Sequence, residues 1–127
     1  MNIYGIGIDI VEIDRIEKAI NKNEKFLNRV FTKKEIEYFK SKNLNINTIS
    51  GNFAGKEAVS KAIGTGIRNY NFNDIEILRD HQGKPFINVK NNLINICEEL
   101  KIKEILISIS HSKNYAVANA VAITKEI

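Results

Sequence analysis

The chain has 127 residues, of which 43% are hydrophobic and 27% are charged, and its formal net charge is +4 at pH 7. This balance supports a folded core and excludes a disordered chain, and the length suits a single domain covering residues 1–127. The positive charge favours an acidic or phosphorylated partner over a basic one.

The first third of the chain predicts one buried strand followed by helices. Residues 1–10 are rich in β-branched residues and glycine and carry no charge before Asp9, so we expect a strand ending at this aspartate. Two short helical segments are expected next, over residues 11–21 and 24–30. Thr32 and Glu35 form a capping-box pattern, which predicts the start of a further helix.

A long helix is expected in the middle of the chain, beginning near Thr48 or Ser50 and reaching Ile63. Three alanines spaced four residues apart share one face of this helix: Ala54, Ala58 and Ala62. Because their side chains are small, this narrow face would allow close packing against a sheet.

The second half of the chain predicts strands and one short helix. The expected elements are a hairpin over residues 74–79 and 85–89, a helix over 91–101, and strands over 104–110 and 115–124. Four alanines share one face of the last strand: Ala116, Ala118, Ala120 and Ala122. Because strands and helices do not alternate, we expect an α+β fold with an antiparallel sheet packed against the long helix.

Cysteine content and apolar stretches predict a cytoplasmic protein without a membrane span. The single cysteine, Cys97, cannot form an internal disulfide and falls in an apolar pattern, so a buried, reduced thiol is expected. The chain start lacks a basic segment and Asp9 interrupts its apolar run, so no signal peptide is expected. The apolar stretch over residues 105–123 contains His111 and Lys113 and is not expected to cross a membrane.

The segment FAGKEAVSKAIGTG, residues 53–66, offers a candidate site for a metal-bound phosphate. Glu57 and Lys61 are four residues apart on one helix face, just before the glycine-rich turn at residues 64–66. Asp9 is the second candidate carboxylate. Each feature also has a simpler interpretation: a surface ion pair for Glu57 and Lys61, a helix end for the glycines, and a helix cap for Asp9.

His111 is a candidate contact for a phosphate or an adenine, because it lies between Ser110 and Ser112 at a predicted strand end. A role in stabilising the turn is equally consistent with this position. Neither serine has the sequence context of a nucleophile, and only one other histidine is present, so a hydrolytic triad is not supported. No cysteine and histidine spacing suggests a zinc site.

Basic residues recur every three or four positions near the start of the chain: Arg15, Lys18, Lys22, Lys25 and Arg29. On a continuous helix they would form one stripe, either a docking surface for an acidic partner or an ordinary solvated face. Phe26 lies among these charges, and an exposed aromatic residue among cations favours the docking surface.

Four motifs together resemble one family, the holo-acyl-carrier-protein synthases, which are small bacterial 4′-phosphopantetheinyl transferases. The motifs are GIGIDIVEIDRI, FAGKEAVSKAIGTGI, GKP at residues 83–85 and SISHS at residues 108–112. They occur in the family's order and cover the chain from its start nearly to its end. The resemblance implies transfer of 4′-phosphopantetheine from coenzyme A to a serine of acyl carrier protein, a step of fatty acid biosynthesis, with release of adenosine 3′,5′-bisphosphate.

The resemblance also implies which residues perform the chemistry. Asp9 and Glu57 would bind Mg²⁺ together with the diphosphate of coenzyme A. Lys61 would neutralise charge on the diphosphate and protonate the leaving phosphate. Asp9 would also take the proton of the serine, acting through a water on the metal.

The same resemblance implies the residues that bind coenzyme A. Gly64, Thr65 and Gly66 would bring backbone close to the coenzyme. Pro85 and His111 would help hold its adenosine 3′-phosphate end.

Acyl carrier proteins are acidic, and the family docks them on its first helices. The corresponding residues here are Arg15, Lys22, Lys25, Phe26 and Arg29. Lys22 and Lys25 stand where arginine is frequent in the family, which removes bidentate pairing with carboxylates.

Two further features follow from the resemblance. The family is commonly trimeric, with each coenzyme site between neighbouring subunits, so a homotrimer is expected. Asn52 stands where the family often has arginine, which leaves one contact to a coenzyme phosphate in question.

Two other functions compete with the transferase. A magnesium-dependent hydrolase of nucleoside diphosphate compounds would use the same carboxylates, but Glu57 is the only acidic residue between Phe53 and Asn73. A nucleic-acid-binding domain would need aromatic residues among basic ones on a sheet face, whereas the predicted strands carry aliphatic residues. We therefore expect no nucleic-acid partner.

Overall fold

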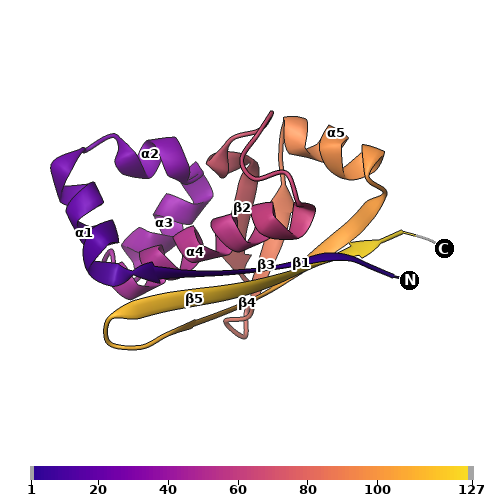
Figure 1. Cartoon of the computed structure of the whole chain (residues 1–127). Helices are drawn as coiled ribbons and strands as arrows, with labels where there is room; N and C mark the ends of the chain where they lie inside the picture. Colours follow the sequence, from indigo (N-terminus) through magenta and orange to yellow (C-terminus); the bar gives the residue numbers. More distant parts are fainter. Residues whose placement is uncertain (1, 126–127) are drawn as a thin grey trace.

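The computed structural model describes residues 2–125, and Figure 1 shows how its elements are arranged. In chain order these elements are β1 (Ile3–Glu12), α1 (Ile13–Lys22), α2 (Phe26–Val30), α3 (Lys33–Ser41), α4 (Ile46–Ile63), the 3-10 turn η1 (Phe72–Asp74), β2 (Ile75–Arg79), β3 (Pro85–Val89), α5 (Asn92–Glu99), β4 (Ile102–His111) and β5 (Tyr115–Thr124). None of the helices it describes is long and apolar enough to cross a membrane.

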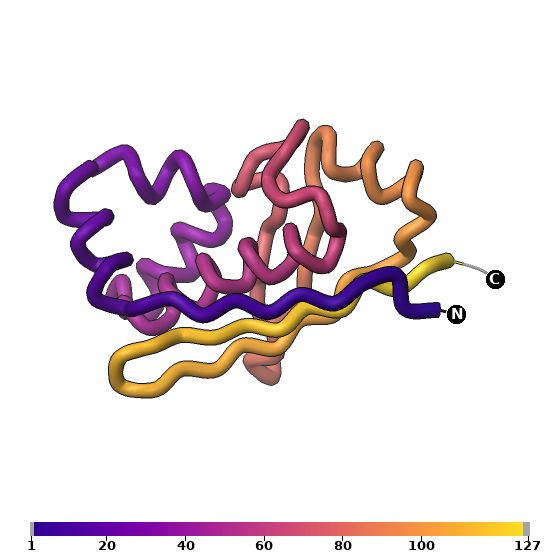
Figure 2. Tube along the Cα trace, in the orientation of Figure 1, coloured from indigo at the N-terminus to yellow at the C-terminus, as the bar shows by residue number. Residues whose placement is uncertain are grey.

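The sheet is antiparallel, as the sequence predicted. Strands β1, β5 and β4 form a three-stranded sheet in that spatial order, and β2 pairs with β3 in a separate hairpin. The long helix α4 lies along one face of the three-stranded sheet, as Figure 2 shows in the same orientation as Figure 1. The expected α+β fold, with an antiparallel sheet against a long helix, is therefore confirmed.

Small residues allow α4 to lie unusually close to β1. A Cβ atom added to Gly7 would lie 2.0 Å from the carbonyl oxygen of Ala58, and one added to Gly5 would lie 2.2 Å from that of Ala62. Both alanines are buried. Any larger residue at Gly5 or Gly7 would therefore push the strand away from the helix.

The other side of α4 is fixed by a buried ion pair. The ammonium of Lys56 lies 2.7 Å from a carboxylate oxygen of Glu35 on α3, and both side chains are fully buried. The ammonium also donates to the carbonyl oxygens of Phe72, at 3.0 Å, and Ile75. Glu35 accepts in addition from the backbone N–H of Ile77, so α3, α4 and β2 share one hydrogen-bond network. Removing the charge of either Lys56 or Glu35 would leave the other charge buried without a partner.

Several element boundaries differ from the sequence prediction by one or more residues, and two of these differences have a clear physical cause. Strand β1 continues past Asp9 to Glu12, because Val11 and Glu12 still pair with β5. Helix α4 begins at Ile46 rather than near residue 48 or 50, because the side chain of Asn45 accepts from two backbone N–H groups of its first turn and caps it there.

Candidate active site

Asp9, Glu57 and Lys61 meet where β1 crosses α4. Asp9 follows Gly5 and Gly7 at every second position of β1, so all three residues lie on the strand face that touches α4. Glu57 and Lys61 are one turn apart on the facing side of the helix. The ammonium of Lys61 lies 3.2 Å from Asp9 Oδ1 and 3.0 Å from the carbonyl oxygen of Ile8.

The arrangement excludes the simpler interpretations of Asp9 and Lys61. Lys61 pairs with Asp9 and, within residues 2–125, forms no ion pair with Glu57, so this is not a surface pair along one helix. Helix α1 begins at Ile13 with Glu12 as its N-cap residue, so Asp9 does not cap it.

The two carboxylates of this site repel each other. Partial burial raises the pKa of Glu57 above its ordinary value, the charge of Asp9 raises it further, and the charge of Lys61 offsets part of the increase. Two carboxylates and one ammonium leave a net negative charge between β1 and α4. This is the electrostatic setting in which a cation binds favourably.

The carboxylates form a dyad rather than a complete metal cage. No group of three or more histidine, cysteine, aspartate or glutamate side chains that could hold a metal ion occurs in the part of the chain that the structure describes. A dyad fits an ion that takes its remaining oxygen ligands from a phosphorylated substrate and water, as Mg²⁺ commonly does.

The glycine-rich turn directly follows the end of α4. Gly64 and Gly66 have φ angles of 94° and 67°, a left-handed conformation that suits glycine. A Cβ atom at either position would meet no atom within 4 Å, so the outer side of this turn is open. Thr65 is exposed, and its hydroxyl donates to the carbonyl oxygen of Gly66 at 2.9 Å. The turn is therefore accessible to a ligand at the end of the helix that carries Lys61.

Pro85 and His111 lie apart from the Asp9 group. Pro85 begins β3, and His111 ends β4, where it pairs with Ala116. No hydrogen bond or ion pair within residues 2–125 joins either residue to Asp9, Glu57 or Lys61. Figure 1 shows the turn of the β2–β3 hairpin well separated from the C-terminal end of α4. Within one chain, Pro85 and His111 therefore lie outside the group formed by Asp9, Glu57 and Lys61.

Asn52 is an internal residue in this structure. Its side chain is fully buried, and its amide nitrogen donates to Glu35 Oε2 at 3.1 Å and to the carbonyl oxygen of Ile77 at 3.0 Å. Its amide oxygen accepts from Nη2 of Arg79 at 2.8 Å. Every polar atom of the side chain is therefore engaged with the protein, which leaves none for a coenzyme phosphate.

The basic residues near the chain start do not form one helical stripe. Helix α1 ends at Lys22 and α2 begins at Phe26, because the chain turns between them. Phe26 is half-buried against the rings of Phe31 and Phe53 rather than exposed, which corrects the expectation of an exposed aromatic residue. The cations themselves are exposed: Arg15, Lys22, Lys25 and Arg29.

An apolar pocket of about 600 Å³ lies beside this basic region. Arg15 and Phe26 line it, as do Ile10 of β1, Ile16 of α1 and Phe53 of α4. Phe53 precedes Glu57 by one helical turn on α4, so the pocket adjoins the Asp9 group along the same helix face.

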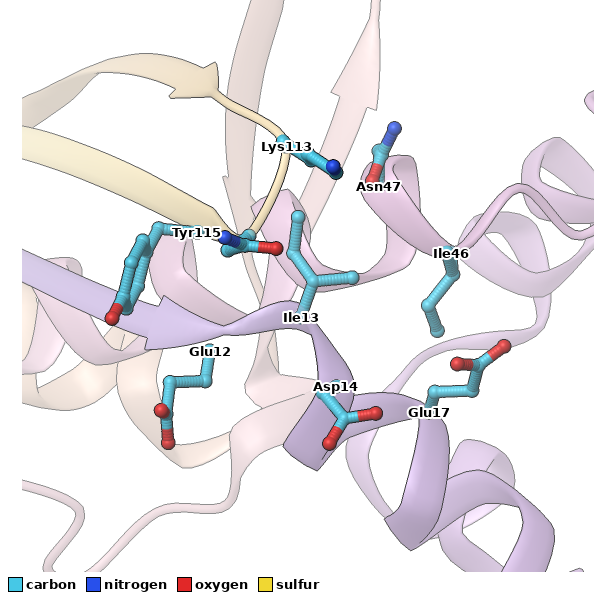
Figure 3. A pocket seen from close by; sticks show the side chains of 9 residues that line it. Glu12, Ile13, Asp14, Glu17, Ile46, Asn47, Lys113 and Tyr115 are labelled. Carbon is cyan, nitrogen blue, oxygen red and sulfur yellow. The ribbon is translucent and has the colours of Figure 1, made fainter.

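A second pocket, of about 470 Å³, lies where α1, the start of α4 and the β4–β5 turn meet. Figure 3 shows the carboxylates of Glu12, Asp14 and Glu17 on one side and Lys113 with Asn47 on the other. None of the residues expected to bind metal or coenzyme lines this pocket.

Sequence reasoning missed Lys56, Glu35 and Arg79. Lys56 stands directly beside Glu57 in the sequence but faces the opposite side of α4. Spacing alone did not indicate that Lys56 is buried. It follows Ala54 and Gly55 in a helix that has small residues on several faces, so no single apolar face marks which side is buried.

Comparisons with known proteins agree with this geometry. A family model described as the 4′-phosphopantetheinyl transferase superfamily matches residues 5–120. The holo-[acyl-carrier-protein] synthase of Alkaliphilus oremlandii is 54% identical over 121 residues, which cover 95% of this chain and 99% of that protein. The protein of the same name from Clostridium botulinum is 57% identical over 119 residues, covering 94% of this chain and 96% of that one.

Solved structures give the same result. The crystal structure of holo-[acyl-carrier-protein] synthase from Neisseria meningitidis has a TM-score of 0.89 and 36% identity, covering 95% of this chain and 98% of that one. The Helicobacter pylori protein, solved in complex with coenzyme A, has a TM-score of 0.81 and 37% identity, covering 92% and 98% of the two chains.

Proposed function

The chain belongs to the 4′-phosphopantetheinyl transferase superfamily, and we propose that Asp9, Glu57 and Lys61 carry out its reaction. The activity is transfer of 4′-phosphopantetheine from coenzyme A to a serine of apo-acyl carrier protein, as in the holo-[acyl-carrier-protein] synthases that it resembles along its length. The meeting of two carboxylates and an ammonium between β1 and α4 carries the assignment. We place this step of fatty acid biosynthesis in the cytoplasm, where the buried Cys97 would stay reduced.

Asp9 and Glu57 would hold Mg²⁺. The raised pKa of Glu57 supports this role, because part of it comes from the charge of Asp9 that a divalent cation would neutralise. Two protein carboxylates with substrate phosphate oxygens form a usual ligand set for this ion. When bound, Mg²⁺ would supply positive charge that stabilises the oxygens of the phosphoryl group under transfer.

The protein side chains move the protons. The serine oxygen of the carrier forms a bond to the phosphorus next to pantetheine, and the bond from that phosphorus to the adenosine-side phosphate oxygen breaks. Asp9 would accept the serine proton through an intervening water, since a hydroxyl is a weak nucleophile until it loses its proton. Lys61 has three N–H donors, of which two contact Asp9 and Ile8, so the third is available to the leaving phosphate and would give it a proton.

Coenzyme A would bind between two copies of the chain. The open turn at Gly64, Thr65 and Gly66 lies at the end of the helix that carries Lys61, where its backbone would contact the coenzyme. Pro85 and His111 would hold the adenosine 3′-phosphate end, but they lie in a different part of the same chain. A neighbouring subunit that supplied these two residues would complete the site.

The outer face of the sheet supports assembly into a homotrimer. Ile6, Ile8 and Ile10 point away from α4, and each is between 62% and 68% exposed. A contiguous row of exposed isoleucines on one strand is unusual for a surface in water and is typical of an interface. We propose that this face packs against neighbouring subunits.

The acidic carrier protein would dock on α1 and α2. Its carboxylates would pair with the exposed cations of this region, Arg15, Lys22, Lys25 and Arg29. The pocket lined by Phe26 and Phe53 would receive an apolar side chain of the carrier. Because Phe53 adjoins Glu57 on the same helix face, a carrier bound there would reach the catalytic group.

A transfer assay tests the proposal. The protein is incubated with coenzyme A, Mg²⁺ and an apo-acyl carrier protein, and the carrier is examined for the mass of an added phosphopantetheine. We expect the addition with the wild-type protein and a large loss of rate with Glu57→Gln, while Lys103→Met, an exposed cation on β4, retains the rate. Consumption of coenzyme without carrier would indicate a hydrolase instead. No addition to a competent carrier would refute the transferase.

A further inference from the structure

Tyr70 brings a hydroxyl into the hydrophobic core and leaves it without a hydrogen bond. The residue lies between α4 and η1, is only 6% exposed, and belongs to the same core cluster as Ile63 of α4 and Leu93 of α5. Its Oη is buried and has no hydrogen-bond partner within residues 2–125. A buried phenol normally finds a partner, because burying an unpaired O–H group costs free energy. Packing of the ring alone therefore does not explain why this residue carries a hydroxyl.

The hydroxyl of Tyr70 lies behind the glycine-rich turn, near the candidate active site. Burial raises the pKa of Tyr70, and the nearby hydroxyl of Thr65 offsets part of the increase. Cys97 and the charge of Glu57 raise this pKa further. Thr65 is thus close to Tyr70 Oη, but the two hydroxyls are not in hydrogen-bonding geometry in the unliganded protein.

Thr65 is the best acceptor among these neighbours. Its own hydrogen is donated to the carbonyl oxygen of Gly66 at 2.9 Å, so the lone pairs of Oγ1 remain free to accept. The thiol of Cys97 is a weak acceptor. The carboxylate of Glu57 is assigned to the metal. A hydrogen bond from Tyr70 to Thr65 would therefore satisfy the buried O–H group without disturbing the metal site.

The turn has room to move relative to the ring. A Cβ atom added to Gly64 or Gly66 would meet no atom within 4 Å, so no described part of the protein holds the outer side of the turn. Tyr70, in contrast, is fixed by the core on the inner side. A ligand on the outer side would contact the turn from the side opposite Tyr70. A small shift of Thr65 toward the core would then bring the two hydroxyls into hydrogen-bonding geometry.

We propose that Tyr70 positions the glycine-rich turn for coenzyme A by donating a hydrogen bond to Thr65 Oγ1 in the coenzyme-bound state. This inference rests on the proposed function, in which the backbone of the turn contacts the coenzyme. Tyr70 touches neither the coenzyme nor the reacting atoms, so it is a positioning residue and not a catalytic one. Because the bond forms only when coenzyme A binds, it contributes to affinity and not to the stability of the free protein.

Tyr70→Phe tests the role of the hydroxyl, because phenylalanine fills the same space in the core. Coenzyme A is titrated into each protein in the presence of Mg²⁺, and the rate of transfer to apo-acyl carrier protein is measured at successive coenzyme concentrations. We expect affinity about 2- to 10-fold lower in Tyr70→Phe, the range of one neutral hydrogen bond, with KM for coenzyme A raised by a similar factor and kcat unchanged. Tyr38→Phe, which removes the hydroxyl of a half-buried tyrosine on α3, should match the wild type.

Thermal unfolding without ligand separates this role from a structural one. The midpoint of Tyr70→Phe should equal or exceed that of the wild type, because the change removes a buried O–H group that has no partner. A tyrosine whose hydroxyl only supported the fold would show the opposite result, a lower midpoint. A lower midpoint with unchanged affinity for coenzyme A would therefore overturn the proposal.

Replacing Thr65 identifies the acceptor. Thr65→Val removes the acceptor oxygen and should weaken coenzyme A binding, whereas Thr65→Ser keeps the oxygen and should retain most of the affinity. In the Thr65→Val background, Tyr70→Phe should cause no further loss, because the two residues act through one bond. A full additional loss in the double variant would overturn Thr65 as the partner of Tyr70.

The outcomes also separate this inference from the proposed function. A folded Tyr70→Phe variant with wild-type affinity and KM for coenzyme A would refute only the role of Tyr70. If Tyr70→Phe does not fold, Thr65 decides, because wild-type affinity in Thr65→Val would refute the bond as well. A wild-type protein that transfers no phosphopantetheine to a competent carrier would instead refute the proposed function.

Discussion

Replacing Gly7 with alanine should damage catalysis through the backbone, although Gly7 takes no part in the chemistry. The added Cβ would lie 2.0 Å from the carbonyl oxygen of Ala58 and 2.7 Å from the backbone nitrogen of Ala62, whereas ordinary contact begins at 3.4 Å. The strand and helix must therefore separate by about 1.4 Å at this point. Neither obstacle is a flexible side-chain end, so the backbone itself has to move.

The displacement would reach Asp9, which lies two residues further along the same strand face. We expect Gly7→Ala to lower the free energy of unfolding by about 1–3 kcal/mol, the usual cost of overpacking. Because a misplacement of about 1 Å can reduce catalysis by roughly 100-fold, kcat should fall by a similar factor. Thermal unfolding and the carrier mass assay measure the two effects on the same sample.

Gly51→Ala provides the matched control. Its Cβ would meet only a methyl group of Ile109, at 2.8 Å, on the side of α4 that faces β4. This variant should lose some stability while retaining kcat, because Asp9 does not move. A folded Gly7→Ala protein with wild-type kcat would refute the argument that close packing of β1 on α4 sets the position of Asp9.

Three further predictions follow from burial and charge. Because the pKa of Glu57 is raised in the folded protein, Glu57 should make metal-free stability fall as pH rises from about 4.5, its unfolded value, through the raised folded value. Denaturant unfolding at successive pH values should therefore show a smaller loss of stability over this range in Glu57→Gln than in the wild type, and an equal loss would contradict the raised pKa. Lys56→Met should lower the free energy of unfolding by about 3–5 kcal/mol, because it leaves the buried carboxylate of Glu35 without a counter-ion. Adding Glu35→Gln to this variant should restore part of the lost free energy, as measured by urea denaturation. Losses that simply add would contradict the pairing. Ile8→Glu places a charge on the face formed by the exposed isoleucines of β1, so the variant should be a folded monomer in analytical ultracentrifugation. A trimer that persisted in this variant would exclude this face as the interface.

The fold followed closely from side-chain periodicity and size. The alternating alanines of β5 and the four-residue spacing of alanines on α4 indicated two faces that pack together, and the structure pairs them. The capping box at Thr32 and Glu35 was confirmed, because both of its hydrogen bonds are present. These signals are local, so the sequence carries them directly.

Boundaries that depend on distant contacts were less predictable. The strand prediction stopped at Asp9 because a charge usually ends a buried strand, but pairing with β5 carries β1 three residues further. The polar segment before α4 concealed the cap at Asn45, since several asparagines there could serve equally well.

The candidate site was predictable where its residues belong to motifs that resemble the family's and not where they lie outside those motifs. Asp9, Glu57 and Lys61 were identified from motif resemblance, and the structure brings them together. The link between Asn52 and Arg79 joins α4 to β2 across 27 positions of sequence, and nothing in either segment predicts the other residue as its partner. Such tertiary hydrogen bonds leave no local pattern.

Binding of Mn²⁺, used as a paramagnetic substitute for Mg²⁺ and followed by electron paramagnetic resonance, tests most directly whether Asp9 and Glu57 share one cation. With coenzyme A present, we expect one ion per chain in the wild type and much weaker binding in both Asp9→Asn and Glu57→Gln, with no further loss when the two changes are combined. Wild-type affinity in either single variant would show that the two carboxylates do not hold a common ion.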